Sequence, residues 1–490
     1  DVKVSGTMIK ILFLTGLLVA VVEARADRPL FDLDAIRDAR TLETTVIQDW
    51  KPSARDKGVL QKLIEVTICE WWVGQKVRIP ITFNVPADRL PCTNVLVMNM
   101  GLGAKPAAAT GGALKLLKED GVGVVLVGMG TIDAMRPVGQ LHLGMKRELL
   151  RTKDVRFTPA WIWGMSQMRG LTAAKAEPEH FRPFKVLATG GSKRGVATAV
   201  AGIHDDRFTA ILPVVAPPLG NPGGPVVLGT EPPRITAANN KFFQDLTAGK
   251  LGLPESTKAA LDGRTGRREA TRVTTAEAKA AGWSDAEIAA LTDRSWDACR
   301  ITDYLPQLRA RGLEFFYNVG SNDSVSPALK ELGNRFPDFP IYIVPGGQHG
   351  GPADAGFTRR VPSLKEVQNN FVAFAQYHFL RKSSLMSAPS IRHQWNANAK
   401  RLTVTTTFSK GESPGQNHLW WSVNRHEPFT LAFEYDEWQS VEMKPMGNGR
   451  FHGELVLEKN PKNLEFITVH SRTAQGETMT ISSPLGRFVP

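Results

Sequence analysis

Continuous apolar runs alternate with amphipathic or small-residue segments through the middle of the chain. The runs at 94–101, 121–128 and 208–215 show no polar alternation, which is typical of strands buried on both faces. Residues 107–117 and 158–176 favour helices. Strands that alternate with helices predict a parallel sheet with right-handed crossover connections.

A different pattern precedes this region. Residues 62–72 and 76–86 mix β-branched and aromatic residues with partial alternation, and Gly74 lies in the break between them. This pattern predicts an antiparallel hairpin at the start of the sheet. Residues 27–58 are polar, and we expect them to be partly helical.

The alternating pattern stops at 217–300 and then resumes. The interruption begins with Pro and Gly and continues as polar helical pieces, which is typical of a cap inserted over a site. After it, 313–320 and 341–345 are predicted strands, and 364–380 is a predicted amphipathic helix.

Short strands separated by turn residues characterise the C-terminal part. The strands are predicted at 400–408, 418–423, 430–435 and 464–471. This spacing favours a β-sandwich. We therefore divide the chain into an α/β domain at 27–384, with 217–300 as its insertion, and a β-sandwich module at 385–490.

Residues 1–26 have the pattern of a signal peptide with a few residues upstream of it. Lys10 follows Met8, residues 11–22 are apolar, and an Ala-x-Ala site ends at Ala26. The apolar stretch is short for a membrane span. We expect an exported chain, secreted or periplasmic, that begins near Asp27 and keeps no membrane span after cleavage.

Composition narrows the function classes. The chain has 490 residues and a formal charge of +12, but its Lys and Arg are spread out, which indicates a solvated basic surface and no nucleic-acid partner. Its three cysteines exclude a disulfide framework. One bridge, Cys69 to Cys92, would require their strands to be neighbours. No Cys-x-x-Cys or His-Glu-x-x-His motif is present, so we predict neither a metal nor a cofactor.

The segment 186–200 predicts a reactive serine. An apolar strand leads into a Gly-rich turn around Ser192, and a helix of small residues follows. Such a strand–turn–helix holds a serine in a strained conformation at the top of a sheet, as in a nucleophile elbow. Gly190 and Gly195 would let the strand and helix approach each other closely. Alone, the motif is equally consistent with an ordinary Gly-rich turn.

Two later loops supply the partners that a nucleophilic serine needs. Asp323 follows the strand at 313–320, and His349 follows the strand at 341–345. The chain order serine, acid, histidine is that of the sheet hydrolases. Because each residue comes just after a predicted parallel strand, we expect all three at the carboxyl edge of one sheet. Ser192, Asp323 and His349 are the predicted catalytic triad.

An oxyanion formed on the substrate needs backbone donors. We predict the N–H of Lys193 as one donor and that of Met100 or Gly101 as the other. The Lys193 ammonium would also hold a substrate carboxylate or the oxyanion. The alternative is that Lys193 and Arg194 are a solvated basic pair.

These motifs resemble the PhoPQ-activated pathogenicity-related family of secreted α/β-hydrolases. The resemblance is carried by the segments 189–195, 205–215, 303–305, 318–323 and 345–350. It implies an α/β-hydrolase fold and the same triad. The turn is also similar to that of glucuronoyl and acetyl xylan esterases, in which a basic residue follows the serine, the place that Lys193 holds here. The glucuronoyl esterases imply Glu231 as a rival to Asp323.

Together, these features predict an exported serine esterase that forms an acyl-enzyme. Its substrate would be a small-molecule or carbohydrate-linked carboxylic ester. Two alternatives remain: a peptidase of the prolyl-oligopeptidase type, and a secreted binding or signalling protein on a hydrolase scaffold. No oligomeric state is predicted.

Overall fold

The computed structural model describes residues 29–100, 105–129, 140–219, 273–323, 329–347, 364–382, 385–409, 411–424 and 438–488. The predicted signal peptide, Gly101, Glu231 and His349 lie outside these residues, as do the predicted strand at 430–435 and most of the insertion. Among the described helices, none is long and apolar enough to cross a membrane.

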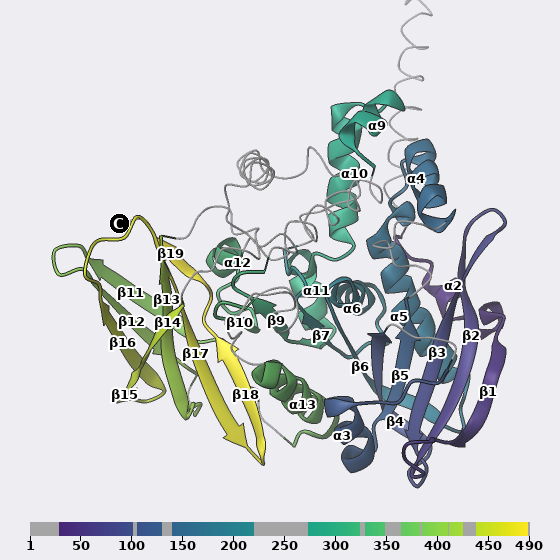
Figure 1. The fold of residues 1–490 in the computed structure, drawn as a ribbon, viewed down its shortest axis with the longest axis horizontal. Coiled ribbons are helices and arrows are strands. Elements are labelled where there is room, and N and C mark those ends of the chain that lie inside the picture. Colours follow the sequence, from purple (N-terminus) through teal and green to yellow (C-terminus); the bar gives the residue numbers. More distant parts are fainter. Residues whose placement is uncertain are drawn as a thin grey trace, which may run out of the picture.

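A mixed sheet organises the first domain (Figure 1). Its strand order is β1-β2-β3-β5-β4-β6-β7-β9-β10, with β8 paired to β7. The strands are β1 Thr45–Pro52, β2 Val59–Trp72, β3 Gln75–Pro86, β4 Cys92–Met100, β5 Gly123–Gly128, β6 Phe181–Gly191, β7 Ala210–Val214, β8 Glu314–Phe315, β9 Tyr317–Gly320 and β10 Ile341–Val344. β1 to β3 are antiparallel, and the strands from β5 to β10 are parallel.

Helices pack against this sheet and against one another. They are α2 Leu33–Arg37, α3 Gly111–Asp120, α4 Gln140–Thr152, α5 Pro159–Lys175, α6 Lys193–His204, α9 Thr275–Ala280, α10 Asp285–Asp297, α11 Leu305–Ala310, α12 Leu329–Arg335 and α13 Leu364–Leu380, with 3₁₀ turns at Ala39–Leu42, Val155–Phe157 and Ile301–Tyr304. α5 packs against α6, and α13 packs against α3. The hairpin, the exchanged order of β4 and β5, and the parallel strands beyond them define an α/β-hydrolase fold, as the sequence predicted.

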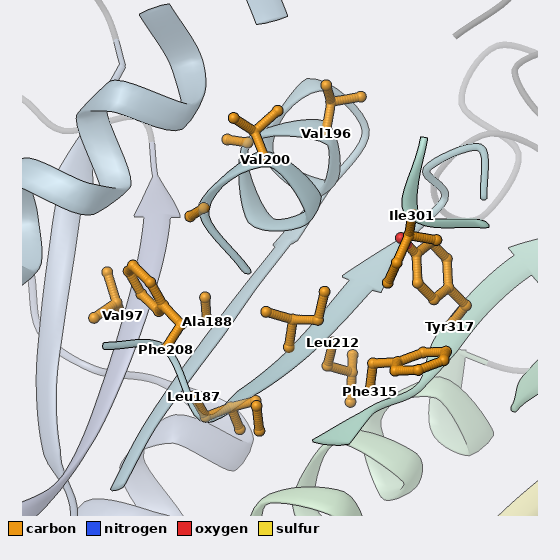
Figure 2. Packing of buried hydrophobic residues seen from close by; sticks show 14 of the residues in the cluster. Val97, Leu187, Ala188, Val196, Val200, Phe208, Leu212, Ile301, Phe315 and Tyr317 are labelled. Carbon is orange, nitrogen blue, oxygen red and sulfur yellow. The ribbon is translucent and has the colours of Figure 1, made fainter. Parts of the chain in front are cut away.

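Buried apolar side chains pack on both sides of α6 (Figure 2). Val196 and Val200 project from the side of α6 that faces away from β6, and Ala188 of β6 is fully buried on the other side. α5 approaches α6 closely because Gly164 has no side chain: a Cβ there would lie 2.1 Å from Val200 Cγ1. Trp161 and Met165 of α5 are buried, as expected for core residues.

One buried cation fixes the N-terminal segment to this core. Arg169 of α5 is 2% exposed and donates to the carbonyl oxygens of Ile36, Asp38 and Thr67 at 2.8–3.2 Å. Burial lowers the pKa of Arg169 to about 10. Carbonyl dipoles thus replace the water that this guanidinium loses on folding.

Residues 27–58 are partly helical, as expected, through α2 and the 3₁₀ turn at Ala39–Leu42, and residues 45–52 form an edge strand that pairs with β2. The condition for a bridge between Cys69 and Cys92 is not met, because β3 and β5 separate their strands, and both cysteines are free. Burial raises the pKa of both thiols to about 12.

The described end of the insertion docks on α4. Trp283 Nε1 donates to the Leu150 oxygen at 3.0 Å, and Lys146 pairs with Glu277 at 2.8 Å. α9 and α10 accordingly lie beside α4 in Figure 1.

Two antiparallel sheets form the C-terminal module, in agreement with the predicted β-sandwich. One has the order β11-β12-β16-β15, and the other has the order β14-β13-β17-β18 with β19 on β17. Their strands are β11 Ser390–Asn396, β12 Arg401–Thr407, β13 Gln416–Val423, β14 Gln439–Glu442, β15 Lys444–Gly447, β16 Arg450–Val456, β17 Leu464–Ala474, β18 Glu477–Ser482 and β19 Gly486–Phe488. β18 lies against α13 of the first domain (Figure 1).

Candidate active site

Ser192 lies in a strained turn between β6 and α6. Its φ of 59° and ψ of −129° are outside the regions that non-glycine residues normally occupy. A Cβ on Gly195 would lie 2.7 Å from the Val214 oxygen, and one on Gly190 would lie 2.7 Å from Arg194 Cβ. Glycine at both positions therefore permits the tight strand-to-helix turn that the sequence predicted, with Ser192 at its apex.

Backbone hydrogen bonds hold this turn against β7. The Ser192 N–H donates to the Val214 oxygen at 2.9 Å, and the Ser192 carbonyl accepts the Val196 N–H at 3.0 Å in the first turn of α6. Val215, which directly follows the last residue of β7, also has a positive φ, of 45°. Positive φ is costly for a β-branched residue, and such strain gathers at functional sites.

Neighbouring side chains of α5 tie two parts of the site together. Gln167 is fully buried and donates to the Thr189 oxygen of β6 at 3.3 Å and to Thr198 Oγ1 of α6 at 3.0 Å. Ser166 accepts from Asn99 Nδ2 of β4 at 3.1 Å. α5 therefore sets the spacing between the elbow and the end of β4, where the second oxyanion donor was predicted.

The loop after β9 places Asp323 at the same edge of the sheet. Asp323 is 1% exposed, and its N–H donates to the Gly320 oxygen at 3.2 Å. The loop is also bonded to the turn after β10: the Asn322 N–H donates to the Gly347 oxygen at 2.8 Å, and Ser321 Oγ accepts the Gly346 N–H at 2.8 Å.

Strand adjacency places four of the predicted residues at one edge of the sheet. β4, β6, β7, β9 and β10 are consecutive parallel neighbours, so Met100 at the end of β4, Ser192 and Lys193 after β6, and Asp323 after β9 all lie at carboxyl ends. Lys193 is the first residue of α6, whose N-terminus favours negative charge. The predicted base His349 and donor Gly101 lie outside the described residues. Gly347, two residues before His349 in the sequence, is hydrogen-bonded beside Asp323.

The described part of the structure also contains a cavity of about 1120 Å³ that lies away from this edge. The cavity is lined by residues 29–36 and by parts of β2 and α5, and neither Ser192 nor Asp323 borders it. Within the residues described, no group of three or more His, Cys, Asp or Glu side chains is arranged to hold a metal ion.

A hydroxyl–imidazole–carboxylate set lies at the amino ends of β7 and β8. His378 of α13 is 3% exposed; its Nδ1 lies 2.7 Å from Glu314 Oε2, and its Nε2 lies 2.9 Å from Thr209 Oγ1. Thr209 Oγ1 also accepts the Val186 N–H at 2.8 Å. Burial lowers the pKa of His378, against the opposing effect of Glu314. The apolar periodicity of residues 364–380 predicted the helix that carries His378 but gave no sign of these partners.

Sequence reasoning also missed Trp438, which the C-terminal module contributes to the edge carrying Asp323. Its Nε1 donates to Asn322 Oδ1 at 3.2 Å, across 116 residues of sequence. No local motif signals such a contact, because it depends on how the two domains pack.

A scan of protein-family models finds no match to this chain, and a search of curated proteins finds none either. Among solved structures, it is similar to a glucuronoyl esterase from Solibacter usitatus, with a TM-score of 0.29 and 16% identity over 41% of this chain and 57% of that one.

Acetyl xylan esterase 1 from Thermoanaerobacterium sp. JW/SL YS485 is similar, with a TM-score of 0.34 and 12% identity over 66% of this chain and 90% of that one. A puromycin-hydrolysing peptidase from Mycobacterium tuberculosis has a TM-score of 0.34 and 15% identity, covering 65% and 40%. The α/β-hydrolase architecture itself is evident from this chain's own strand order and elbow.

Proposed function

We propose that this protein is an exported serine hydrolase that cleaves carboxylic esters. The observation that carries the proposal is the backbone of Ser192, with φ 59° and ψ −129° at the junction of β6 and α6. Strain of this kind persists where surrounding structure enforces it, and it aims a side chain for function.

The chemistry follows from the arrangement at this edge. Ser192 Oγ attacks the ester carbonyl carbon as His349 accepts its proton, and Asp323 orients and stabilises the resulting imidazolium. The proton then passes to the departing alcohol. Water, activated by the same base, hydrolyses the acyl-enzyme to release the carboxylic acid.

Stabilisation of the oxyanion is assigned to backbone groups. The Lys193 N–H at the start of α6 is one donor, and the loop after Met100 supplies the other. The hydrogen bonds from Gln167 and Asn99 support the spacing of these two arms, because they connect β6 and β4 to the same helix.

Substitution of the nucleophile tests the proposal. Ser192→Ala should lower kcat for p-nitrophenyl acetate by about 10⁴-fold or more, since no other hydroxyl replaces the attacking atom. Ser390→Ala, at an exposed position of β11, is the matched control and should retain full activity. A fluorophosphonate probe should label the native chain at Ser192, as located by peptide mapping. Full activity in folded Ser192→Ala would overturn the proposal.

A substrate panel tests the ester assignment. We expect turnover of acetylated neutral sugars and of an acetylated glucuronic acid whose carboxylate is free. A Lys193→Ala variant should lose more activity on the acetylated glucuronate than on the neutral acetylated sugar, because an ammonium favours a carboxylate. Turnover of aminoacyl-naphthylamides without turnover of esters would instead indicate a peptidase.

Export is tested on the protein as its natural host produces it. N-terminal sequencing of protein recovered from the periplasm or the medium should begin near Asp27. A cytoplasmic chain that retains Met8 would contradict this part of the proposal.

A further inference from the structure

The two domains are joined by a buried polar seam that reaches the strands of the active-site edge. Asn370 of α13 exchanges hydrogen bonds with Thr480 of β18, at 2.7 and 2.9 Å, and its amide also donates to Asn318 Oδ1 of β9 at 3.0 Å. All three residues are 0% exposed. β9 is the strand that leads into Asp323, so the module is bonded to the support of the acid loop.

Ser482 continues this seam along the edge strand of the sheet. Its Oγ accepts the Ile343 N–H at 2.9 Å and lies 3.2 Å from the Ile341 oxygen of β10. β10 carries the turn at Gly346 and Gly347. Unsatisfied buried polar groups are costly, so this seam fixes the register of the module against β10.

Trp438 extends the contact from the strands to the loop beside the acid. Its indole N–H donates to Asn322 Oδ1, the atom that Ser321 Oγ also approaches at 3.0 Å. Its ring lies over Gly346, where a Cβ would be 3.5 Å from Trp438 Cδ1. Trp438 therefore contacts both the loop after β9 and the turn after β10.

We propose that the C-terminal module is part of the catalytic unit and that Trp438 is a positioning residue for the Asp323 carboxylate. This inference rests on the proposed function. Asn322 is 4% exposed and directly precedes Asp323, so its side-chain hydrogen bonds restrict the backbone from which the carboxylate projects. The indole N–H from the module completes that restriction.

The test variant removes the indole N–H donor of Trp438 and keeps an aromatic ring at that position. Trp438→Phe should lower kcat for p-nitrophenyl acetate by about 10-fold while KM stays within about 2-fold, because positioning acts on the reacting geometry. The acid limb of the kcat/KM profile should also move to lower pH, by on the order of half a unit. A carboxylate that lies less close to the base stabilises the imidazolium less and lowers its pKa.

Two further variants make the readout specific. Trp395→Phe is the matched control in the same module, since Trp395 Nε1 is buried with no hydrogen-bond partner among the described residues. It should leave kcat and the pH profile unchanged. Asn322→Leu should reproduce the shift of Trp438→Phe, and the double variant should show no more than the effect of Asn322→Leu alone.

Each outcome has a distinct meaning. A folded Trp438→Phe whose acid limb coincides with that of the native protein overturns the inference, even if kcat falls, because a merely structural role scales activity without moving the limb. An equal shift in Trp395→Phe overturns it as well. If the native chain is not labelled by fluorophosphonate at Ser192, the proposed function fails and this inference fails with it.

Discussion

Two hydroxyl residues at opposite ends of the same parallel strands differ in what surrounds them. At the carboxyl edge, Ser192 has a strained backbone and lies at a helix N-terminus. At the amino edge, Thr209 has His378 and Glu314 at hydrogen-bonding distances that would suit a catalytic triad.

The two residues differ in backbone conformation, and the Thr209 hydroxyl is already engaged by the backbone of Val186. Thr209 is not among the residues with a positive φ, and its Oγ1 accepts the Val186 N–H and lies 3.1 Å from the Val186 oxygen. Two cations complete this cluster: Lys185 donates to the His378 carbonyl oxygen, and Arg381 forms an ion pair with Glu314. This set binds α13 to the sheet. A triad-like list of residue types is therefore insufficient evidence of a nucleophile, and backbone strain is the better criterion.

The largest expected effect comes from filling the elbow. A Cβ at Gly195 would lie 2.7 Å from the Val214 oxygen and 2.9 Å from Ala216 Cβ, so Gly195→Ala should force the turn open. We expect a loss of about 3 kcal/mol of unfolding free energy and about 100-fold slower fluorophosphonate labelling. Gly312→Ala, with φ +74° and open space around it, should cost about 1 kcal/mol and leave labelling unchanged. Equal labelling in both variants would contradict the close-packed elbow.

Another buried histidine extends the comparison to pH. His470 is 0% exposed; its Nδ1 lies 2.6 Å from Asn417 Oδ1, and its Nε2 has no hydrogen-bond partner among the described residues. Burial, assisted by nearby His418, lowers the pKa of His470 to about 3. Because the unfolded histidine titrates near 6.5, unfolding takes up a proton below that pH, and stability falls as pH falls through this window toward 3.

Urea unfolding at several pH values measures this effect. Between pH 6.5 and 4, the native protein should lose about 3 kcal/mol through His470 alone. His470→Gln should lose that much less over the same range. An identical pH slope in the two proteins would show that His470 does not control acid sensitivity.

Removing the imidazole at the amino edge separates structure from catalysis. His378→Phe deletes the hydrogen bonds to Thr209 and Glu314, and we expect about 2 kcal/mol lower unfolding free energy. Labelling of Ser192 should stay within about 2-fold of native at a temperature where the variant is folded. Loss of labelling in the folded variant would place this set in the catalytic machinery, contrary to the comparison.

The smallest expected effect is a gain in stability. Ser192→Gly should raise the unfolding free energy by about 1 kcal/mol, because glycine accepts the positive φ without strain. It should also abolish labelling. Thr209→Gly should instead lower stability. A lower melting temperature for Ser192→Gly would argue against strain at the elbow.

Much of the fold was predictable because its signals are local. The apolar helix period located α13 at Leu364–Leu380, and the break at Gly74 located the hairpin. The elbow was predictable for the same reason, since its glycines and serine are consecutive. Chain order then placed Asp323 in the loop after β9.

The unpredicted parts depend on pairing between distant segments. β1 is mostly exposed and becomes a strand through its pairing with β2. β8 and β9 were expected as one strand, but Phe316 separates them and β8 pairs with β7. The hydrogen bond between Trp438 and Asn322 and the set around His378 join residues 64 to 169 positions apart, so no spacing rule reveals them.

The seam at Thr480 and Ser482 has a consequence for the order in which the molecule is made. During synthesis, the chain bearing Ser192 and Asp323 emerges before residues 438–482. Asn370, Ile343 and Asn322 can therefore complete their hydrogen bonds only when the last strands have been delivered and folded. Under the proposed role of Trp438, a partly made chain would carry a serine with a less firmly positioned acid, so hydrolysis would reach its full rate only after residues 438–482 have folded.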